Sequence, residues 1–511
     1  MKNINHSKNI KINLYIRYSY YFIQFFSGFF LIPFYLNNFS IKLYGVWILI
    51  SSICAFLMLM DPSSSHLIVQ QISEKIKKFG YRKVNEIILP SILNAILISF
   101  FIILAGNYFL FPILTNIINS EFHNNEINFI MKFVIANISL LILISTFTGF
   151  FEGLQKSQSF GPIILLGLIL KIILVIFLIN KNYGIKSIIL SEFIANILIL
   201  FYLIILFLFR YKNLLIDYKI NLTDYLRFSK KYVHNYGGRF SKIFIMGGLD
   251  SVLISKFVGL DMVTILNLAQ KVPSQIQALI GLFFTSSRSS ISYLLVGKKS
   301  TNNDKLIINL VNAIIIINIF LFYLLFDVLN PFLRIWISQD IFLNDFLIIL
   351  IILIMILRIY ISSIQSLLFS KGNIGFVNNI QISHSLILIP LIIIFSFLYK
   401  LEGLLVTYLI INFIYIAPIC TKKLFQTFKN ENVYLIKEYI DYIKIAFGLI
   451  ITTIVYKYLF KQISLEIDTW LSLFFICIIK VLIFNIFLIF IKRDLRIFLL
   501  NKFLINKKRY K

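Results

Sequence analysis

Apolar residues fill long stretches of this chain from end to end, with little alternation between apolar and polar positions. Each stretch holds about twenty residues, enough for one helix to cross roughly 30 Å of hydrocarbon. The polar segments between them are too short to form a soluble domain. The pattern predicts an all-α polytopic membrane protein with about fourteen transmembrane helices. We place them at 14–36, 44–61, 87–111, 128–150, 160–179, 187–209, 232–258, 264–296, 306–330, 346–369, 377–398, 404–421, 440–460 and 469–490.

The first span and the span at 264–296 differ from the others. The first follows a basic N-terminal segment and lacks a small-residue cleavage site, so we interpret it as a retained helix and not as a removed signal peptide. The span at 264–296 is longer than a bilayer requires, and we expect an extramembrane turn within it.

The composition agrees with a membrane protein, because 59% of the residues are hydrophobic and the mean hydropathy is +0.88. The net charge of +27 is compatible with a nucleic-acid partner, but its distribution argues against one. Alternate loops and the C-terminal tail hold most of the 49 Lys and Arg residues, above all the loops 62–86 and 210–231. Such a bias orients membrane proteins with the basic loops inside, so we expect cytoplasmic termini and contact with membrane lipid.

Two short landmarks occur twice along the chain. Residues 39–46, at the end of the first span, correspond to residues 257–264, at the end of the seventh. Residues 183–189, before the sixth span, correspond to residues 399–405, before the twelfth, at nearly the same separation. The spacing indicates an internal repeat of six helices.

The repeat predicts three parts. These are an N-terminal six-helix bundle at 10–210, a C-terminal six-helix bundle at 230–425, and two appended helices at 438–492. Parallel repeats of this kind are typical of transporters whose halves surround a central cavity.

The landmarks also resemble a known family. Residues 32–47, which include Pro33, Tyr44, Gly45 and Trp47, look like the first-to-second-helix signature of the oligosaccharide flippases. Residues 250–269 look like the seventh-to-eighth-helix signature of that family, and residues 149–156 and 370–372 stand where the family has short cytoplasmic turns. The resemblance covers roughly residues 10–425. It places the chain near the polysaccharide-exporter branch of the multidrug/oligosaccharidyl-lipid/polysaccharide superfamily.

The resemblance implies a transporter and not an enzyme. Its substrate would be an undecaprenyl-diphosphate-linked oligosaccharide, carried from the cytoplasmic to the outer leaflet of the bacterial inner membrane. The product pathway would be O-antigen (lipopolysaccharide), capsule or teichoic-type polysaccharide. A polysaccharide polymerase and a chain-length regulator would be partners.

Cationic residues within the spans are candidates for contact with the diphosphate of the substrate that the resemblance implies. Ionisable groups at membrane depth normally face protein or a water-filled cavity. Arg358, Ser362 and Gln365 are spaced as i, i+4 and i+7, so they form one polar helix face. The expected substrate-binding cations are Arg17, Arg239, Lys242, Lys271, Arg288 and Arg358. For Arg17 and Arg288, snorkelling toward the cytoplasmic headgroups is an equal alternative.

Asp61 and Asp250 are candidates for a coupling ion, although helix capping or pairing with a nearby cation explains them as well. Glu192 also lies in a span but is no better a candidate. Lys480 belongs to the appended helices and lacks a polar stripe, so we assign it no role.

Two other functions remain as alternatives. A multidrug or cation antiporter of the same superfamily would favour twelve helices and an acidic cavity. A membrane O-antigen polymerase or glycosyltransferase would present a large outer loop, whereas the segment 112–127 is short. The sequence has no Walker-type glycine loop and no HExxH motif, so we expect no cofactor, no metal and no catalytic residue.

Overall fold

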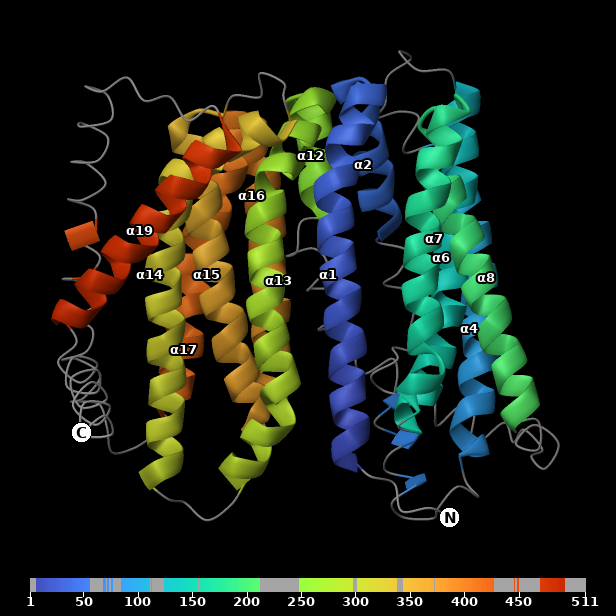
Figure 1. Ribbon diagram of the computed structural model, residues 1–511, viewed down its shortest axis with the longest axis horizontal. Coiled ribbons are helices and arrows are strands. Elements are labelled where there is room, and N and C mark those ends of the chain that lie inside the picture. Colours follow the sequence, from blue (N-terminus) through green and yellow to red (C-terminus); the bar gives the residue numbers. More distant parts are fainter. Residues whose placement is uncertain are drawn as a thin grey trace, which may run out of the picture. The chain divides into compact units, whose positions relative to one another are not determined.

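The described part of the computed structural model consists of helices and the short turns between them, without a strand (Figure 1). The described residues are 6–55, 68–69, 71–72, 75–76, 84–110, 112, 124–154, 156–211, 248–296, 301–337, 343–371, 373–426, 445, 448–449 and 469–491. Most of the predicted spans at 440–460 and 232–258 therefore lie outside them. The all-α class predicted from the sequence is confirmed.

The described residues group into two compact units, Met1–Thr264 and Ile265–Lys511. The first contains α1 (His6–Asn38), α2 (Ile41–Ala55), α4 (Asn85–Ala105), α6 (Asn124–Gly153), α7 (Gly161–Asn180), α8 (Lys186–Tyr211) and α12 (Gly248–Phe257). The next helix, α13 (Leu260–Val296), begins at the end of the first unit and continues into the second. The second contains α14 (Thr301–Ile337), α15 (Asp345–Ser370), α16 (Ile374–Ile411), α17 (Ala417–Gln426) and α19 (Trp470–Ile491).

Nine helical stretches among the described residues are long and apolar enough to cross a membrane. One of them, residues 375–426, covers two predicted spans. Inside α16 the backbone leaves the helical region at Tyr399 and at Lys400, whose φ is 53°. This kink separates the spans that the sequence predicts at 377–398 and 404–421. A multi-pass membrane protein is thus confirmed, while the count of fourteen stays a prediction.

The turn expected within 264–296 is wrong. α13 runs without interruption from Leu260 to Val296, with Pro273 inside it. Proline removes one backbone hydrogen bond but does not have to end a helix, since neighbouring groups can satisfy the freed carbonyl. A helix of this length extends beyond the bilayer or tilts within it.

In the first unit, α6 and α8 pack together, α7 packs on α8, and α4 packs on α6. Small residues permit the closest approaches: a Cβ on Gly167 of α7 would lie 2.4 Å from Cδ1 of Ile199 on α8. Membrane helices associate largely through such van der Waals packing. Buried aromatic residues such as Phe150 and Phe207 fill the space between α6 and α8, with ring centres 5.3 Å apart.

In the second unit, α15 packs against α14, α16 and α17, and α14 also contacts α19. Figure 1 shows α14 and α15 side by side and α19 crossing α14 obliquely. α15 is enclosed by its neighbours along most of its length. The predicted boundaries of the bundles and of the appended pair stay a prediction.

Candidate functional site

The candidate site in the second unit is built on α15. The helix begins where the side chain of Asn344 accepts a hydrogen bond from the backbone N–H of Phe346, as N-cap residues do. From Leu347 to Ser370 every position is described, and Ser362 is the one exposed residue among them. The most exposed position of this stretch is therefore polar, although apolar residues such as Leu353 and Leu357 are also partly exposed. We call the side of α15 that carries Ser362 its open side.

Arg358 lies one turn before Ser362 on the same face and is half-buried. Its guanidinium carbon stands 4.9 Å from the ring centre of Tyr408, which is only 1% exposed. Tyr408 follows the kink in α16, so the second half of that helix supplies the aromatic face. A cation over an aromatic ring is stabilised electrostatically, more so away from water. The arrangement holds a cationic side chain at membrane depth.

Gln365, one turn beyond Ser362, continues the polar face toward α16 and α17. Gln381 of α16 donates a hydrogen bond to Oε1 of Gln365 (3.1 Å), and Nε2 of Gln365 lies 3.9 Å from the sulfur of Cys420. His384 follows Gln381 by one turn on α16, and it is close enough to Arg358 for the two side chains to interact electrostatically. We call Arg358, Ser362, Gln365, Gln381, His384 and Tyr408 the arginine cluster.

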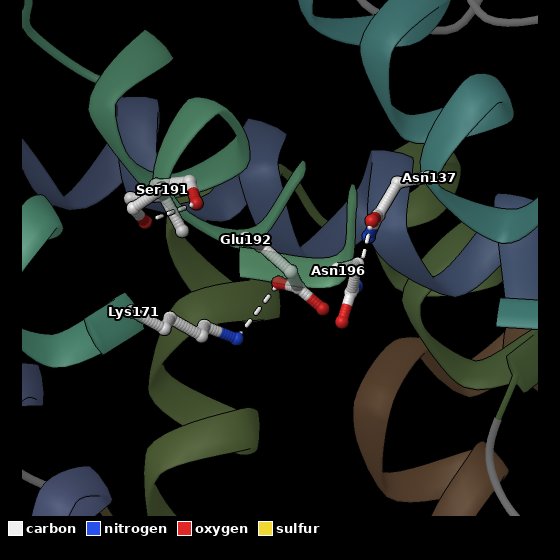
Figure 2. A network of polar contacts seen from close by, with 6 residues as sticks. Asn137, Lys171, Ser191, Glu192 and Asn196 are labelled. Carbon is white, nitrogen blue, oxygen red and sulfur yellow. Dashed lines mark hydrogen bonds and ion pairs between the residues drawn. The ribbon is translucent and has the colours of Figure 1, made fainter. Parts of the chain in front are cut away.

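The first unit contains a second polar group of residues, shown in Figure 2. Nζ of Lys171 on α7 forms an ion pair of 2.8 Å with Glu192 on α8. One turn along α8, Asn196 donates a hydrogen bond of 2.8 Å to Oδ1 of Asn137 on α6. In the figure the Lys171 side chain extends toward the Glu192 carboxylate, and Asn196 faces Asn137. The network joins α6, α7 and α8.

The charges in this network balance each other. The Lys171 and Glu192 side chains are each about one-third exposed or less, and the ion pair leaves no net charge between α7 and α8. Tyr20 and Tyr35 of α1 also lie within electrostatic reach of Glu192. A paired carboxylate is much less unfavourable at membrane depth than a lone one. The network thus links the three helices through polar contacts, and the charge of Glu192 is balanced by Lys171.

A third charged contact joins α14 to α19. Nζ of Lys480 lies 2.5 Å from Oδ2 of Asp327, and the two side chains are 1% and 5% exposed. The same ammonium donates a hydrogen bond to the backbone oxygen of Tyr323 and stands 4.5 Å from that residue's ring centre. Lys480 is therefore fully compensated inside the protein.

The structure describes three of the eight site residues expected from the sequence together with their side chains. Arg358 lies in the arginine cluster, Lys271 is half-buried on α13, and Asp250 is buried on α12. Arg17 belongs to α1 and Arg288 to α13, but the structure describes only the backbone of these two residues. Asp61, Arg239 and Lys242 lie outside it entirely.

Sequence reasoning missed the partners of the charges it noticed. The sequence analysis did not pair Glu192 with Lys171 or Lys480 with Asp327, because the partners lie on different helices: neighbouring ones in the first case, and helices 153 positions apart in the second. The signal that was present is the i, i+4 spacing of Glu192 and Asn196, which puts both on one face of α8. His384 and Tyr408 carry no such signal.

Comparisons with known proteins concern the fold alone. No protein-family model and no curated protein matches the sequence. Among solved structures, the lipid II flippase MurJ in an inward closed conformation is similar over 94% of this chain and 98% of its own, with a TM-score of 0.68 and 16% identity. An inward-facing multidrug resistance MATE transporter of the MOP superfamily is similar over 81% of this chain and 96% of its own (TM-score 0.59, 12% identity).

A MATE transporter of Vibrio cholerae is similar over 84% of this chain and 99% of its own, with a TM-score of 0.55 and 14% identity. All three similarities extend over nearly the whole of the solved chains, so they concern the complete fold and not a fragment. The chain therefore has the fold of these solved transporters.

Proposed function

We propose that this protein is a flippase that carries a polyprenyl-diphosphate-linked oligosaccharide from the cytoplasmic to the outer leaflet. One observation carries the proposal: the open side of α15 carries the exposed Ser362 and, one turn away, the half-buried Arg358. Such a charge is tolerated where it meets an anion or a water-filled path. The fold is compatible with this role, since a lipid II flippase shares it.

A diphosphate is the kind of anion that suits such a site. It has about two negative charges and only hydrogen-bond acceptors, which arginine meets bidentately and lysine as a point charge. In this proposal the other cations, Arg17, Arg239, Lys242, Lys271 and Arg288, assist along the path. The protein would act in the bacterial inner membrane with both termini in the cytoplasm. It would supply O-antigen, capsule or teichoic-type synthesis alongside a polymerase and a chain-length regulator.

A multidrug or cation antiporter is the second candidate, because MATE transporters share the fold. Cation transport requires acidic groups that a cationic substrate or a coupling ion can reach. Lys171 already neutralises Glu192. Asp61 and Asp250 remain proposed coupling groups. The sign of the charge on the open side of α15 favours an anionic substrate.

Substitution of Arg358 in the native host tests the proposal. We expect Arg358→Ala to weaken headgroup binding by about 1.5–3 kcal/mol, the scale of a hydrogen bond to a charged group, which is roughly ten- to hundredfold. Surface polysaccharide should fall sharply while the amount of protein in the membrane stays normal. Arg358→Lys should keep part of the activity, because it keeps the charge and loses the bidentate geometry.

Arg334→Ala is the matched control, because Arg334 is an exposed arginine in the last turn of α14. It should leave surface polysaccharide unchanged. Wild-type polysaccharide levels in Arg358→Ala would rule out the cationic mechanism and leave Arg358 a structural residue.

A further inference from the structure

His384 is the histidine of the arginine cluster. It lies on α16 and is 4% exposed, although histidine is a polar residue that normally finds partners when buried. Its Nε2 makes no hydrogen bond to any residue in the part of the chain that the structure describes. A buried polar atom of this kind needs an explanation, such as a strained site or a ligand.

The polar neighbours of His384 on α16 all have partners. Gln381 donates to Gln365, Ser383 accepts from the hydroxyl of Tyr415 (3.0 Å), and Ser385 donates to the backbone oxygen of Ile382 (2.8 Å). These three neighbours on α16 are therefore satisfied, whereas Nε2 of His384 is not.

The charge beside His384 indicates what its partner would be. Arg358 acts on His384 electrostatically from α15. Two positive groups at this depth would repel each other, whereas an anion between them would be attracted by the guanidinium and would accept a hydrogen bond from the imidazole. Phosphate oxygens only accept hydrogen bonds, so they select the neutral tautomer that carries its proton on Nε2.

We propose that His384 is a second phosphate-binding residue, which donates a hydrogen bond from Nε2 to a phosphate oxygen of the lipid substrate held by Arg358. The inference rests on the proposed flippase function and adds a named contact to it. It also explains the route of approach: Ser362, one turn from Arg358, is exposed on the open side of α15, so the cluster is not sealed.

Binding of geranylgeranyl diphosphate to the purified full-length protein in lipid nanodiscs tests this contact, with geranylgeraniol as the phosphate-free probe. The wild-type protein should bind the diphosphate more tightly than the alcohol. His384→Leu, which keeps the volume and removes the donor, should weaken diphosphate binding by about ten- to hundredfold and leave alcohol binding unchanged. His384→Gln should keep most of the affinity, because its amide places a donor near the position of Nε2.

Ser385→Ala is the matched control. Ser385 is the next residue on α16, is equally buried, and bonds only to its own helix in the contact described above. Its affinity for the diphosphate should equal that of the wild-type protein.

A second measurement needs no variant that removes the donor. In protein labelled with ¹⁵N-histidine, the Nε2 signal that His384→Gln lacks should shift on addition of geranylgeranyl diphosphate and not of geranylgeraniol. If His384→Leu binds as the wild type does and the signal stays in place, while Arg358→Ala loses binding, His384 has no such role and the flippase proposal stands. If the wild-type protein does not distinguish the diphosphate from the alcohol, both proposals fail.

Discussion

At the scale of single residues, close packing explains why position 45, at the start of α2, is a glycine. An added Cβ at Gly45 of α2 would lie 2.4 Å from the backbone oxygen of Leu260 and 2.9 Å from Oγ1 of Thr264. The hydroxyl of Thr264 in turn donates to the backbone oxygen of Ile41 (2.8 Å). The start of α13 thus rests directly on α2, and only glycine leaves room for it.

We expect Gly45→Ala to lower the stability of the purified protein, because the clash is with backbone and cannot be relieved by a rotamer change. Overpacking of this kind costs about 1–3 kcal/mol. The measurement is the melting temperature in detergent, with Gly281→Ala as the control, since nothing lies within 4 Å of a Cβ there. Equal melting temperatures for the two variants would show that α2 and α13 do not approach this closely.

The sequence reveals single residues only in part. The i, i+4, i+7 spacing indicated the polar face of Arg358, since all its members lie on one helix. The roles of Tyr408 and His384 depend on how α15 meets α16, and no local pattern encodes that. The sequence analysis noted Gly45 as part of the first-to-second-helix signature, but the carbonyl of Leu260, which requires a glycine there, lies more than two hundred residues away.

At the scale of helices, α19 is fixed to α14 by the Lys480–Asp327 ion pair with apolar contacts on both sides. Phe320 and Phe484 have ring centres 4.8 Å apart, and Phe332 and Trp470 are 5.9 Å apart. The apolar contacts alone do not fix which turn of α19 meets which turn of α14. The buried charge pair does, because any other register would leave both charges in an apolar environment.

Breaking this pair should detach α19. In a background with Cys54 and Cys420 replaced by alanine, a cysteine at Leu324 of α14 and native Cys477 of α19 pack against the same apolar cluster. A short bis-maleimide should join them in the parent protein. Asp327→Lys or Lys480→Asp should each abolish the cross-link, since removing one partner of a buried pair costs about 3–5 kcal/mol.

The double exchange, Asp327→Lys with Lys480→Asp, should restore the cross-link. Undiminished cross-linking in both single variants would show that the pair does not hold the helix. Sequence analysis noticed Lys480 but gave it no role, because its partner lies on another helix. Hydropathy predicts which segments of the sequence form membrane helices, but it does not predict which of these helices pack against each other.

At the scale of the whole molecule, the hydropathy pattern predicted the class of protein and most of the spans. This was possible because a membrane helix satisfies its backbone hydrogen bonds within its own segment, so the hydropathy of that segment alone identifies it. The exception is α13, a continuous helix within which a turn was expected. The fold extends over nearly the whole of MurJ, and the substrate remains a proposal that depends on Arg358.

The most direct test of the flippase proposal is transport by the purified protein in proteoliposomes. A fluorescent prenyl-diphosphate-linked oligosaccharide, placed in one leaflet, should appear in the other only when the wild-type protein or Arg334→Ala is present. Arg358→Ala should slow its appearance about ten- to hundredfold, in line with the loss of one hydrogen bond to a charged group. Equal rates in wild-type and Arg358→Ala vesicles, or no transport by the wild-type protein, would contradict the proposal.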